Sequence, residues 1–583
     1  MKRQKSRIIA LVISLMMVFV LVAACTPQYE TAEPPPATPA PVDPGPVTDE
    51  PDEPEPPPAE VEIDNILRFG GQGWDGIFNP LLSNNVYDTY VVDLIFEALI
   101  TNTPAGEFIP NIAAWEVSNE NLTYTFTLTD GVAFSDGVPM TSADVAFTYR
   151  TFAHPDYDGV RSYVVMDLDG YDAYSEGETD EFPGIEIIDE RTIAFHFAEG
   201  TASPANIQNF VFPIIPEHFY AFDTWDDFIA KNSTPLGSGL FVLEEYRDRE
   251  FIMLSRNLNY WNPAGAAQLD GILMQDIPEE SLIGAFQTGQ LDIANPVSSP
   301  DNYDAFSAMG GVLAEVVTGN SYNFMQFNTT IPQLSDHRVR QALLYALDRE
   351  AFIEVAYGPF GSVGLSPVSP VSWAFDPAGL NDYAFNMERA AELMEEAGWV
   401  MGDDGVRVNG GNRMEITWLV YPEAPWPGIL SGLAADTWRQ LGVDLTIELM
   451  DFVTVGQRTL SAATIGERDF DMYTMGWSMA IDPCLVGGIF GLDDPSLGDG
   501  GFNASGWHNA EGQQMMLDAR RNFDQAERTR LYNELSAMFN YYVPTVVIAL
   551  RSTLWVQSDR IQGLELGPYS DWVHNIEQVS LAR

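Results

Sequence analysis

The chain has very little cysteine. Its 583 residues contain only two, Cys25 and Cys484, which are too few for a zinc knuckle or an iron–sulfur ligand set. Histidine is also scarce, and none of the spacings typical of paired metal ligands occurs. The six histidines stand at positions 154, 196, 218, 337, 508 and 574. A P-loop is absent from the sequence as well. We therefore expect no metal site and no cofactor.

Basic residues are the second shortage. Lys and Arg total 28 against 84 Asp and Glu, which gives a formal net charge of -56. Nucleic-acid binding depends on Lys and Arg that neutralise phosphates, so this balance excludes a nucleic-acid partner. We interpret the acidity as a source of colloidal solubility or an adaptation to a saline habitat, rather than as a site for a cationic partner.

Only one long apolar run is present, at residues 8–22, and it is interrupted only by Ser14. Four basic residues precede it, and Val22, Ala23 and Ala24 close it before Cys25. A run shorter than ~20 apolar residues favours an export signal over a transmembrane anchor. Residues 21–25 resemble the bacterial lipobox, in which the cysteine is diacylated and becomes the new N-terminus. Residues 1–24 are thus predicted to be a lipoprotein signal peptide.

On that resemblance, Cys25 carries a lipid anchor on the outer face of the cytoplasmic membrane. Cys484 is then the remaining cysteine, so we expect no intramolecular disulfide. Residues 26–62 hold thirteen prolines and ten acidic residues, a composition too poor in bulky apolar side chains to fold. We expect residues 25–62 to form an extended tether of up to roughly 110 Å. The folded part begins near Ile63.

Strand and helix patterns alternate along the remaining ~520 residues, a length that suggests two or three lobes. Residues 122–128 alternate apolar side chains with threonine, and Ile193, Phe195 and Phe197 repeat the pattern, which puts His196 on the wetter face. Two apolar stripes predict helices. They are Val339, Ala342, Leu343, Ala346 and Leu347, then Met387, Ala390, Ala391, Met394 and Ala397, the second ended by Gly398. This mixture predicts α/β or α+β lobes.

Three strings resemble functional motifs. Residues 71–76, GQGWDG, match the dinucleotide fingerprint, but the Phe78-Asn79-Pro80 sequence prevents the helix that this motif requires. Residues 476–480, GWSMA, lack the last glycine of a nucleophile elbow around Ser478. The acidic stretch 167–181 lacks the calcium-loop spacing. Local chemistry therefore favours a binding protein over an enzyme, and we assign no catalytic residue.

Longer strings resemble family 5 of the extracytoplasmic solute-binding proteins, the oligopeptide-, dipeptide- and nickel-binding components of ABC importers. The matching segments stand in family order. They are residues 111–118, 122–128, 130–145, 256–261, 286–292, 336–350 and 390–399, then Gly476-Trp477 followed by Asp482-Pro483. The resemblance extends from about Phe78 to Trp555.

The resemblance implies a two-lobed α/β fold of the periplasmic-binding-protein kind (type II, cluster C), with an additional α+β subdomain and a ligand cleft between the lobes. Lobe I would comprise residues 63–98, 199–297 and 552–583, the subdomain residues 99–198, and lobe II residues 298–551. Hinge closure over a peptide or similar-sized solute would prepare delivery to the subunits of an ABC permease. The resemblance further implies a monomer that is not an enzyme.

The resemblance also implies ligand contacts. The backbone beside Gly476 and Trp477 would bind the ligand main chain. The aspartate that usually follows the tryptophan by three residues is Ala480 here, and the arginine that some relatives place just before the Gly-Trp pair is absent. Asp482 would either reach the ligand's amine in its stead or stabilise a turn before proline.

Five further residues are predicted by position to line the cleft. They are Asn84, Asn85, Tyr322, Asn323 and Phe452. For Tyr322 and Phe452, core packing is the alternative to ligand stacking. Two other functions stay open: a solute sensor or chaperone-like surface lipoprotein on the same scaffold, and an exported hydrolase that uses Ser478.

Overall fold

A computed structural model describes residues 65–118, 120–460, 468–485 and 503–582 of the chain. The chain divides into two compact units, Met1–Glu62 and Ile63–Arg583, and every described residue belongs to the second. The predicted signal peptide, Cys25 and the tether lie outside the described residues. Within the described ranges, no helix combines the length and the apolar character needed to cross a bilayer.

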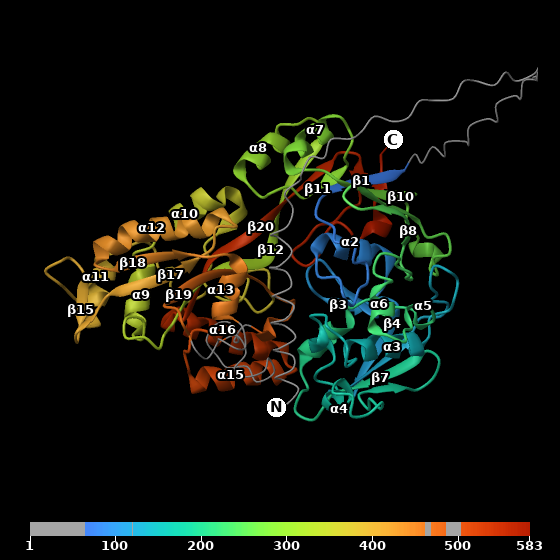
Figure 1. The fold of residues 1–583 in the computed structure, drawn as a ribbon, viewed down its shortest axis with the longest axis horizontal. Coiled ribbons are helices and arrows are strands. Elements are labelled where there is room, and N and C mark those ends of the chain that lie inside the picture. Colours follow the sequence, from blue (N-terminus) through green and yellow to red (C-terminus); the bar gives the residue numbers. More distant parts are fainter. Residues whose placement is uncertain (1–64, 119, 461–467, 486–502, 583) are drawn as a thin grey trace, which may run out of the picture. The chain divides into compact units, whose positions relative to one another are not determined.

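One large mixed sheet runs through the second unit (Figure 1). Its strands, in spatial order, are β18 (Asp444–Leu449), β17 (Glu415–Val420), β19 (Met472–Ser478), β12 (Val312–Phe327), β20 (Thr545–Ser558), β11 (Ile293–Ala294), β1 (Ile66–Gly71), β10 (Gly271–Asp276), β9 (Phe251–Arg256) and β8 (Phe241–Arg247), with β13 (Gly361–Ser362) beside β20. The long strands β12 and β20 pair antiparallel in the middle of this order.

A separate antiparallel sheet has the order β4-β5-β7-β6. Its strands are β4 (Ala113–Ser118), β5 (Thr123–Leu128), β7 (Thr192–His196) and β6 (Ile185–Ile187). The strands predicted from period-two alternation are confirmed as β5 and β7. Ile193 and Phe195 are buried while His196 is partly exposed, as the alternation predicted. Smaller sheets pair β2 (Ile100–Asn102) with β3 (Phe108–Pro110), β15 (Arg407–Asn409) with β14 (Val400–Met401) and β16 (Asn412–Arg413), and β21 (Ile561–Gln562) with β22 (Ser580–Leu581).

Helices cover these sheets. In chain order they are α2 (Val86–Ile95), α3 (Ser142–Phe152), α4 (Tyr171–Ser175), α5 (Glu217–Tyr220), α6 (Trp225–Ile229), α7 (Leu282–Gln287), α8 (Pro300–Ser307), α9 (His337–Tyr345), α10 (Arg349–Ala356), α11 (Met387–Glu396), α12 (Pro425–Leu441), α13 (Phe452–Thr459), α15 (Ala510–Arg521) and α16 (Gln525–Tyr542). Both predicted helices are confirmed, as α9 and α11, although Ala346 and Leu347 lie just beyond α9 and Ala397 caps α11. Gly398 follows α11 with a φ of 86°, a left-handed conformation that ends the helix.

Two large hydrophobic cores are present among the described residues. The first is built from residues between Tyr322 and Leu550, and the stacked rings of Trp418 and Trp438, 5.5 Å apart, lie within it. The second is built mainly from residues before Ile293, with a few from the end of the chain. A smaller cluster lies around α7 and α8. The two large cores are separate interiors, as expected of a protein with two α/β lobes.

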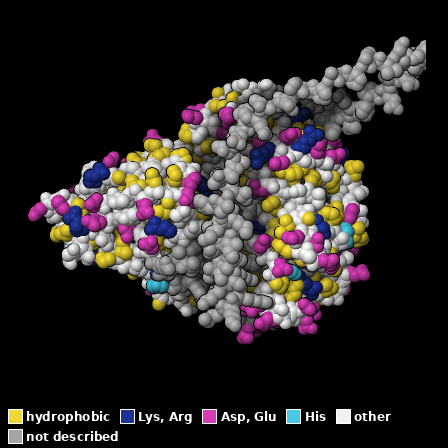
Figure 2. All heavy atoms as spheres, viewed as in Figure 1, with side chains coloured by type: hydrophobic (Ala, Val, Ile, Leu, Met, Phe, Trp, Pro, Cys, Tyr) yellow, Lys and Arg dark blue, Asp and Glu magenta, His cyan; other side chains and the backbone are white. Residues whose placement is uncertain are grey.

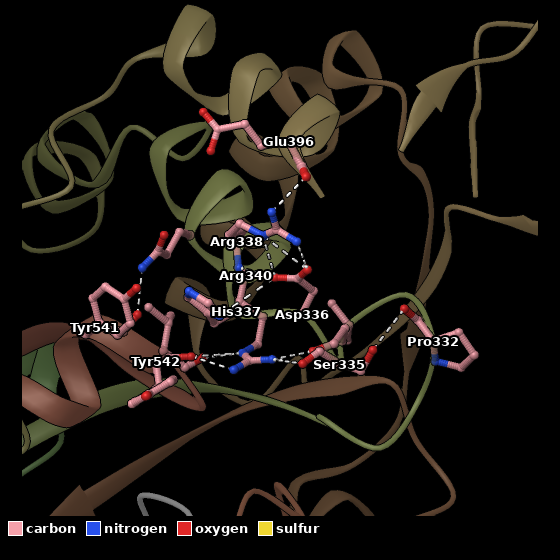
Figure 3. A network of polar contacts seen from close by, with 12 residues as sticks. Pro332, Ser335, Asp336, His337, Arg338, Arg340, Glu396, Tyr541 and Tyr542 are labelled. Carbon is pink, nitrogen blue, oxygen red and sulfur yellow. Dashed lines mark hydrogen bonds and ion pairs between the residues drawn. The ribbon is translucent and has the colours of Figure 1, made fainter. Parts of the chain in front are cut away.

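A buried arginine gives the DHRVRQ string at 336–341 a structural role (Figure 3). Asp336 caps α9 by accepting the Arg338 N–H at 2.9 Å, and it also pairs with the Arg338 guanidinium. Arg340 is 1% exposed and donates to the carbonyl oxygens of Tyr542 at 2.6 Å and Leu334 at 2.5 Å. Burial lowers the pKa of Arg340 to about 10. This side chain therefore fastens α9 to the end of α16.

A second motif, RNLNYW at 256–261, is also structural. Tyr260 Oη and Trp261 Nε1 donate to the two carboxylate oxygens of Glu97, at 2.8 and 2.7 Å. Burial raises the pKa of Glu97 to about 7, although both hydrogen bonds oppose the shift. The two donors therefore fix the Glu97 carboxyl group whether or not it carries a proton.

Candidate ligand-binding site

Three parallel strands of the large sheet end at the same edge. Strands β17, β18 and β19 run parallel, and their carboxyl ends lead into Tyr421, Phe452 and the Gly476-Trp477-Ser478 segment. In open α/β sheets, ligands bind outside the carboxyl ends of the strands. A cavity of about 480 Å³ lies at this edge. Its lining residues are Asn323, Tyr421, Ala424, Trp426, Phe452, Gly476, Trp477, Ser478 and Arg551.

Strand pairing brings three of these residues to one face of the sheet. Asn323 of β12 stands opposite Gly476 of β19, and Ser321 of β12 stands opposite Arg551 of β20. Side chains two residues apart on a strand share a face, and paired residues point to the same side. Asn323, Gly476 and Arg551 therefore meet at the floor of the cavity, although they lie far apart in sequence on three different strands.

Aromatic rings form one wall. Tyr421 contacts Trp426 and Phe452 edge to face, with ring centroids 5.9 and 5.1 Å apart. Tyr421 and Trp426 are buried, whereas Phe452 is 44% exposed toward solvent. Trp477 is partly buried and packs against the first core. Such rings offer apolar contact area with little loss of side-chain freedom, which suits a ligand that has apolar groups.

Glycine at position 476 keeps the floor open. A Cβ atom there would lie 3.4 Å from Asn323 Nδ2 and 3.9 Å from Arg551 Nη2. The two donor groups therefore approach the same point above the glycine. Tyr357 Oη donates to Asn323 Oδ1 at 2.8 Å, which fixes the amide so that its nitrogen is left for the cavity.

Arg551 brings the positive charge of this site. Burial raises the pKa of Tyr421 to about 12 and also raises the pKa of Tyr357, and in both cases the nearby Arg551 charge opposes the shift. Both phenols therefore remain neutral at neutral pH. The lining residues include no His, Asp or Glu, so the cavity itself offers no general acid–base pair.

Four of the predicted ligand contacts are brought together by this cavity: Asn323, Phe452, Gly476 and Trp477. Tyr322 is not among the lining residues. It is fully buried in the first core and its hydroxyl donates to Met479 Sδ at 3.5 Å. Because Tyr322 and Asn323 are neighbours on a strand, their side chains point to opposite faces, and only Asn323 reaches the cavity.

Asp482 also lies away from the cavity lining. Both of its carboxylate oxygens accept from Arg528, at 2.7 and 2.8 Å, and side-chain exposure is 8% for Asp482 and 5% for Arg528. The Cys484 N–H donates to Asp482 Oδ1 at 3.0 Å. This bond stabilises a turn, which is the role that the sequence analysis gave as the alternative to a ligand contact. The carboxylate is thus already occupied within the protein.

Asn84 and Asn85 belong to a different region, at the start of α2. Asn84 is exposed, and Asn85 caps the helix by accepting the Tyr87 N–H at 2.9 Å. The Asn85 amide nitrogen donates to the carbonyl of Gly73 at 2.6 Å and to Asp75 at 3.1 Å. Neither asparagine is among the residues that line the cavity at Trp477.

The sequence prediction missed Tyr421, Ala424, Trp426 and Arg551. A signal existed for each. Residues 421–427, YPEAPWP, interleave aromatic residues with proline directly after a strand, as expected of a rigid loop at a sheet edge. Arg551 interrupts the apolar run of β20, where a charged side chain needs a reason to be present.

The structure describes the surroundings of the motif-like strings. Residues 72–79 leave β1 without regular structure, and the next helix begins only at Val86, so no helix N-terminus faces the glycines. Ser478 lines the cavity, but no histidine does. Within the described residues, no group of three or more His, Cys, Asp or Glu side chains is arranged to hold a metal ion.

The site and the fold together define a class. Two α/β cores joined through one sheet, with an open aromatic cavity at the carboxyl ends of parallel strands, are features of a solute-binding protein. Residues 107–484 match the profile described as "Bacterial extracellular solute-binding proteins, family 5 Middle". Because this match covers more than half of the chain, the protein belongs to family 5 of the bacterial extracellular solute-binding proteins. The family prediction is confirmed.

Two curated relatives illustrate the sequence similarity. The chain is 22% identical over 526 residues to the oligopeptide-binding protein AppA of Bacillus subtilis, a match covering 88% of this chain and 91% of that protein. It is 26% identical over 495 residues to the di/tripeptide-binding protein 1 of Pseudomonas aeruginosa, covering 82% and 86% respectively.

Solved structures share the fold. AppA from B. subtilis, in complex with a nonapeptide, aligns with a TM-score of 0.68 at 22% identity over 89% of this chain and 99% of that one. NikA from Brucella suis, in complex with Fe(III)-EDTA, aligns with a TM-score of 0.73 at 19% identity over 88% and 99%. At these identities the likeness concerns the fold alone. It confirms the predicted two-lobed periplasmic-binding-protein fold.

Proposed function

We propose that this protein captures a peptide or a solute of similar size and delivers it to the permease of an ABC importer. The observation that carries the proposal is the cavity at Trp477, where aromatic side chains, the Asn323 amide and the unpartnered Arg551 Nε atom stand beside the carboxyl ends of parallel strands. Relatives named as oligopeptide- and di/tripeptide-binding proteins favour peptides as the ligand class. The protein binds its ligand without turnover.

The ligand contacts in this proposal are Asn323, Gly476, Trp477, Phe452 and Arg551. Tyr421 and Trp426 support them from the side. Trp477 and Phe452 provide apolar area, while Asn323 and Arg551 bind polar groups of the ligand. Asp482 holds a structural role instead.

Hinge closure is the second part of the proposal. The pairing of β12 with β20 shifts register between Thr318 and Ser321, and the core to which the strand belongs changes between Val317 and Tyr322. A Cβ atom at Gly319 would lie 3.0 Å from the Arg551 carbonyl oxygen, so the two strands approach closely there. We place the hinge at this break, with lobe II ending at Arg551.

The sequence prediction places lobe I at residues 63–98, 199–297 and 552–583 and lobe II at residues 298–551, and a hinge at 318–321 moves residues 298–317 to lobe I. The subdomain stays at residues 99–198. The subdomain would contain the β4-β5-β7-β6 sheet. Cys25 and the proline-rich segment that follows it would tether the protein to the outer face of the cytoplasmic membrane.

Native mass spectrometry of the full-length protein, purified in detergent, tests the proposal. We expect a bound solute to be released on denaturation and identified in the supernatant. Small-angle scattering should then show a lower radius of gyration for the loaded protein than for the stripped protein. Equal radii with a tightly bound solute would refute hinge closure, and chemical conversion of the added solute would refute binding without turnover.

A further inference from the structure

Two hydrogen-bond donors in the cavity have no acceptor in the part of the chain that the structure describes. The Nε atom of Arg551 is buried without a partner, and its guanidinium forms no ion pair with any described residue. Asn323 is 1% exposed, and its Nδ2 atom donates to no described group, because Tyr357 engages only the amide oxygen. Buried donors left unsatisfied are costly, more so when they are charged.

Arg551 is partly buried, and three arginines that are fully buried bind groups within the protein. Arg340 donates to four carbonyl oxygens, and Arg349 donates to the carbonyls of Gly364 and Asp382. Arg528 binds a carboxylate. The chain contains three times as many acidic as basic residues, so carboxylates that could pair with an arginine are abundant. Arg150, Arg161, Arg349 and Arg468 also have a buried guanidinium nitrogen without a described partner, so what distinguishes Arg551 is its place in the lining of the cavity.

The protein's own carboxylates near this floor are occupied or absent. Glu423 lies on the loop between β17 and α12, and its Oε1 atom accepts the Phe452 N–H at 2.9 Å. It forms no ion pair with Arg551 at the distances described. On the face of the molecule shown in Figure 2, the acidic side chains of the described residues are spread over the surface. Their charges are screened within ~8 Å at physiological ionic strength.

We propose that Arg551 and Asn323 form a carboxylate subsite above Gly476, so that the captured solute presents a free carboxylate to the floor of the cavity. This inference rests on the proposed function and names the chemical class of the ligand. Guanidinium and amide N–H groups bind one carboxylate through short, charge-assisted bonds of about 2.7–2.9 Å. Gly476 leaves room for the anion, and the aromatic rings line one side of that space.

A tryptic digest of casein is the probe, used before and after methyl esterification of its carboxyl groups. Full-length protein, stripped of endogenous solute, is mixed with each digest, and captured peptides are identified by mass spectrometry. We expect the wild type to capture peptides from the untreated digest and at least about tenfold less from the esterified digest. The dominant captured peptide is then resynthesised with an amidated C-terminus, which separates a C-terminal carboxylate from an acidic side chain.

Three variants test the two residues. Arg551→Gln removes the charge, and Asn323→Asp places a carboxylate of the same size beside Arg551 and so fills the subsite from within. Both should capture at least about tenfold less from the untreated digest. Arg439→Gln is the matched control, since it removes one charge from an exposed position outside the cavity and should capture as the wild type does. Thermal unfolding checks that each variant is folded. If Arg551→Gln does not fold, Arg551→Lys replaces it and should show a smaller loss of peptide capture.

Equal capture from both digests by the wild type, or equal capture by Arg551→Gln and Arg439→Gln, would overturn the carboxylate subsite while leaving solute binding intact. A wild type that captures nothing from either digest would instead refute peptide capture. In that case acetate, with acetamide as the neutral isostere, probes the subsite directly. The subsite would be supported if acetate, but not acetamide, raised the thermal unfolding midpoint of the wild type and had no such effect on Asn323→Asp. An equal rise with acetate in the wild type and in Asn323→Asp would overturn it.

Discussion

Removing the carboxylate of Asp482 distinguishes a structural ion pair from a ligand contact. The pair with Arg528 is bidentate and buried, and the Arg528 guanidinium also lies 5.0 Å from the Trp373 ring centroid. Although burial alone would lower the pKa of Arg528, the hydrogen bonds and charge of Asp482 raise it above its ordinary value. The Asp482→Ala substitution therefore leaves a buried cation without its counter-ion.

The expected loss of stability is about 3–5 kcal/mol, the cost of breaking a buried pair by removing one partner. Unfolding in urea, followed by tryptophan fluorescence, measures it. With a slope of ~3 kcal/mol per molar urea, the midpoint should fall by at least about 1 M. Replacing both partners with apolar residues, as in Asp482→Leu with Arg528→Met, should recover most of this loss because no charge is then left unpaired.

Solute capture by Asp482→Ala is the second measurement, because a structural residue and a ligand contact predict different results for it. If Asp482 is structural, folded Asp482→Ala should capture solute with nearly wild-type affinity under conditions where it remains folded. A variant whose urea midpoint is unchanged but which no longer captures solute would refute the structural role, and would restore Asp482 as the group that binds the ligand's amine.

Three further predictions concern separate features. Gly476→Ala should fold normally, since the new Cβ meets its neighbours at ordinary contact distances of 3.4 and 3.9 Å, but should weaken solute capture measured by calorimetry, because the methyl group occupies the ligand's place. The folded-state pKa of Glu97, about 7, exceeds its ordinary value of 4.5, so the stabilisation from the bound proton is complete below pH 4.5 and lost as pH rises through 7. Urea titrations should therefore show the wild type losing up to about 3 kcal/mol relative to Glu97→Gln across that window, and parallel pH profiles would contradict it. Cys25→Ser should leave the protein in the soluble fraction after cell fractionation, whereas membrane retention would argue against lipidation.

Sequence patterns predicted what depends on local periodicity. The stripes of α9 and α11 and the alternation of β5 and β7 all concern residues within one turn or one pleat of each other, so a short window contains the whole signal. The strand edge at Gly476 and Trp477 was predicted through the family resemblance, and the cavity lies there. In each case the relevant neighbours are close in sequence or fixed by the family.

The missed residues depend on pairings that no window contains. Arg551 reaches the cavity only because β20 pairs with β12 in one particular register, and a shift of one residue would turn its side chain to the other face. The same geometry separates Tyr322 from Asn323. The sequence left two roles open for Asp482, a ligand contact or a turn, because its partner Arg528 lies on a helix 46 residues further along the chain. Long-range pairing therefore decides which candidate side chains face the ligand.

The position of Arg551 connects binding with closure. Along β20, Leu550 belongs to the first large core, while Leu554 belongs to the smaller cluster around α7 and α8, so the arginine stands where the strand leaves one interior for the next. A ligand shifts a conformational equilibrium only by the difference between its affinities for the two states. A solute held by lobe II alone would bind without closing the protein. Closure therefore requires that a solute anchored at Arg551 also contact lobe I, and a carboxylate too short to do so should bind weakly and leave the radius of gyration unchanged.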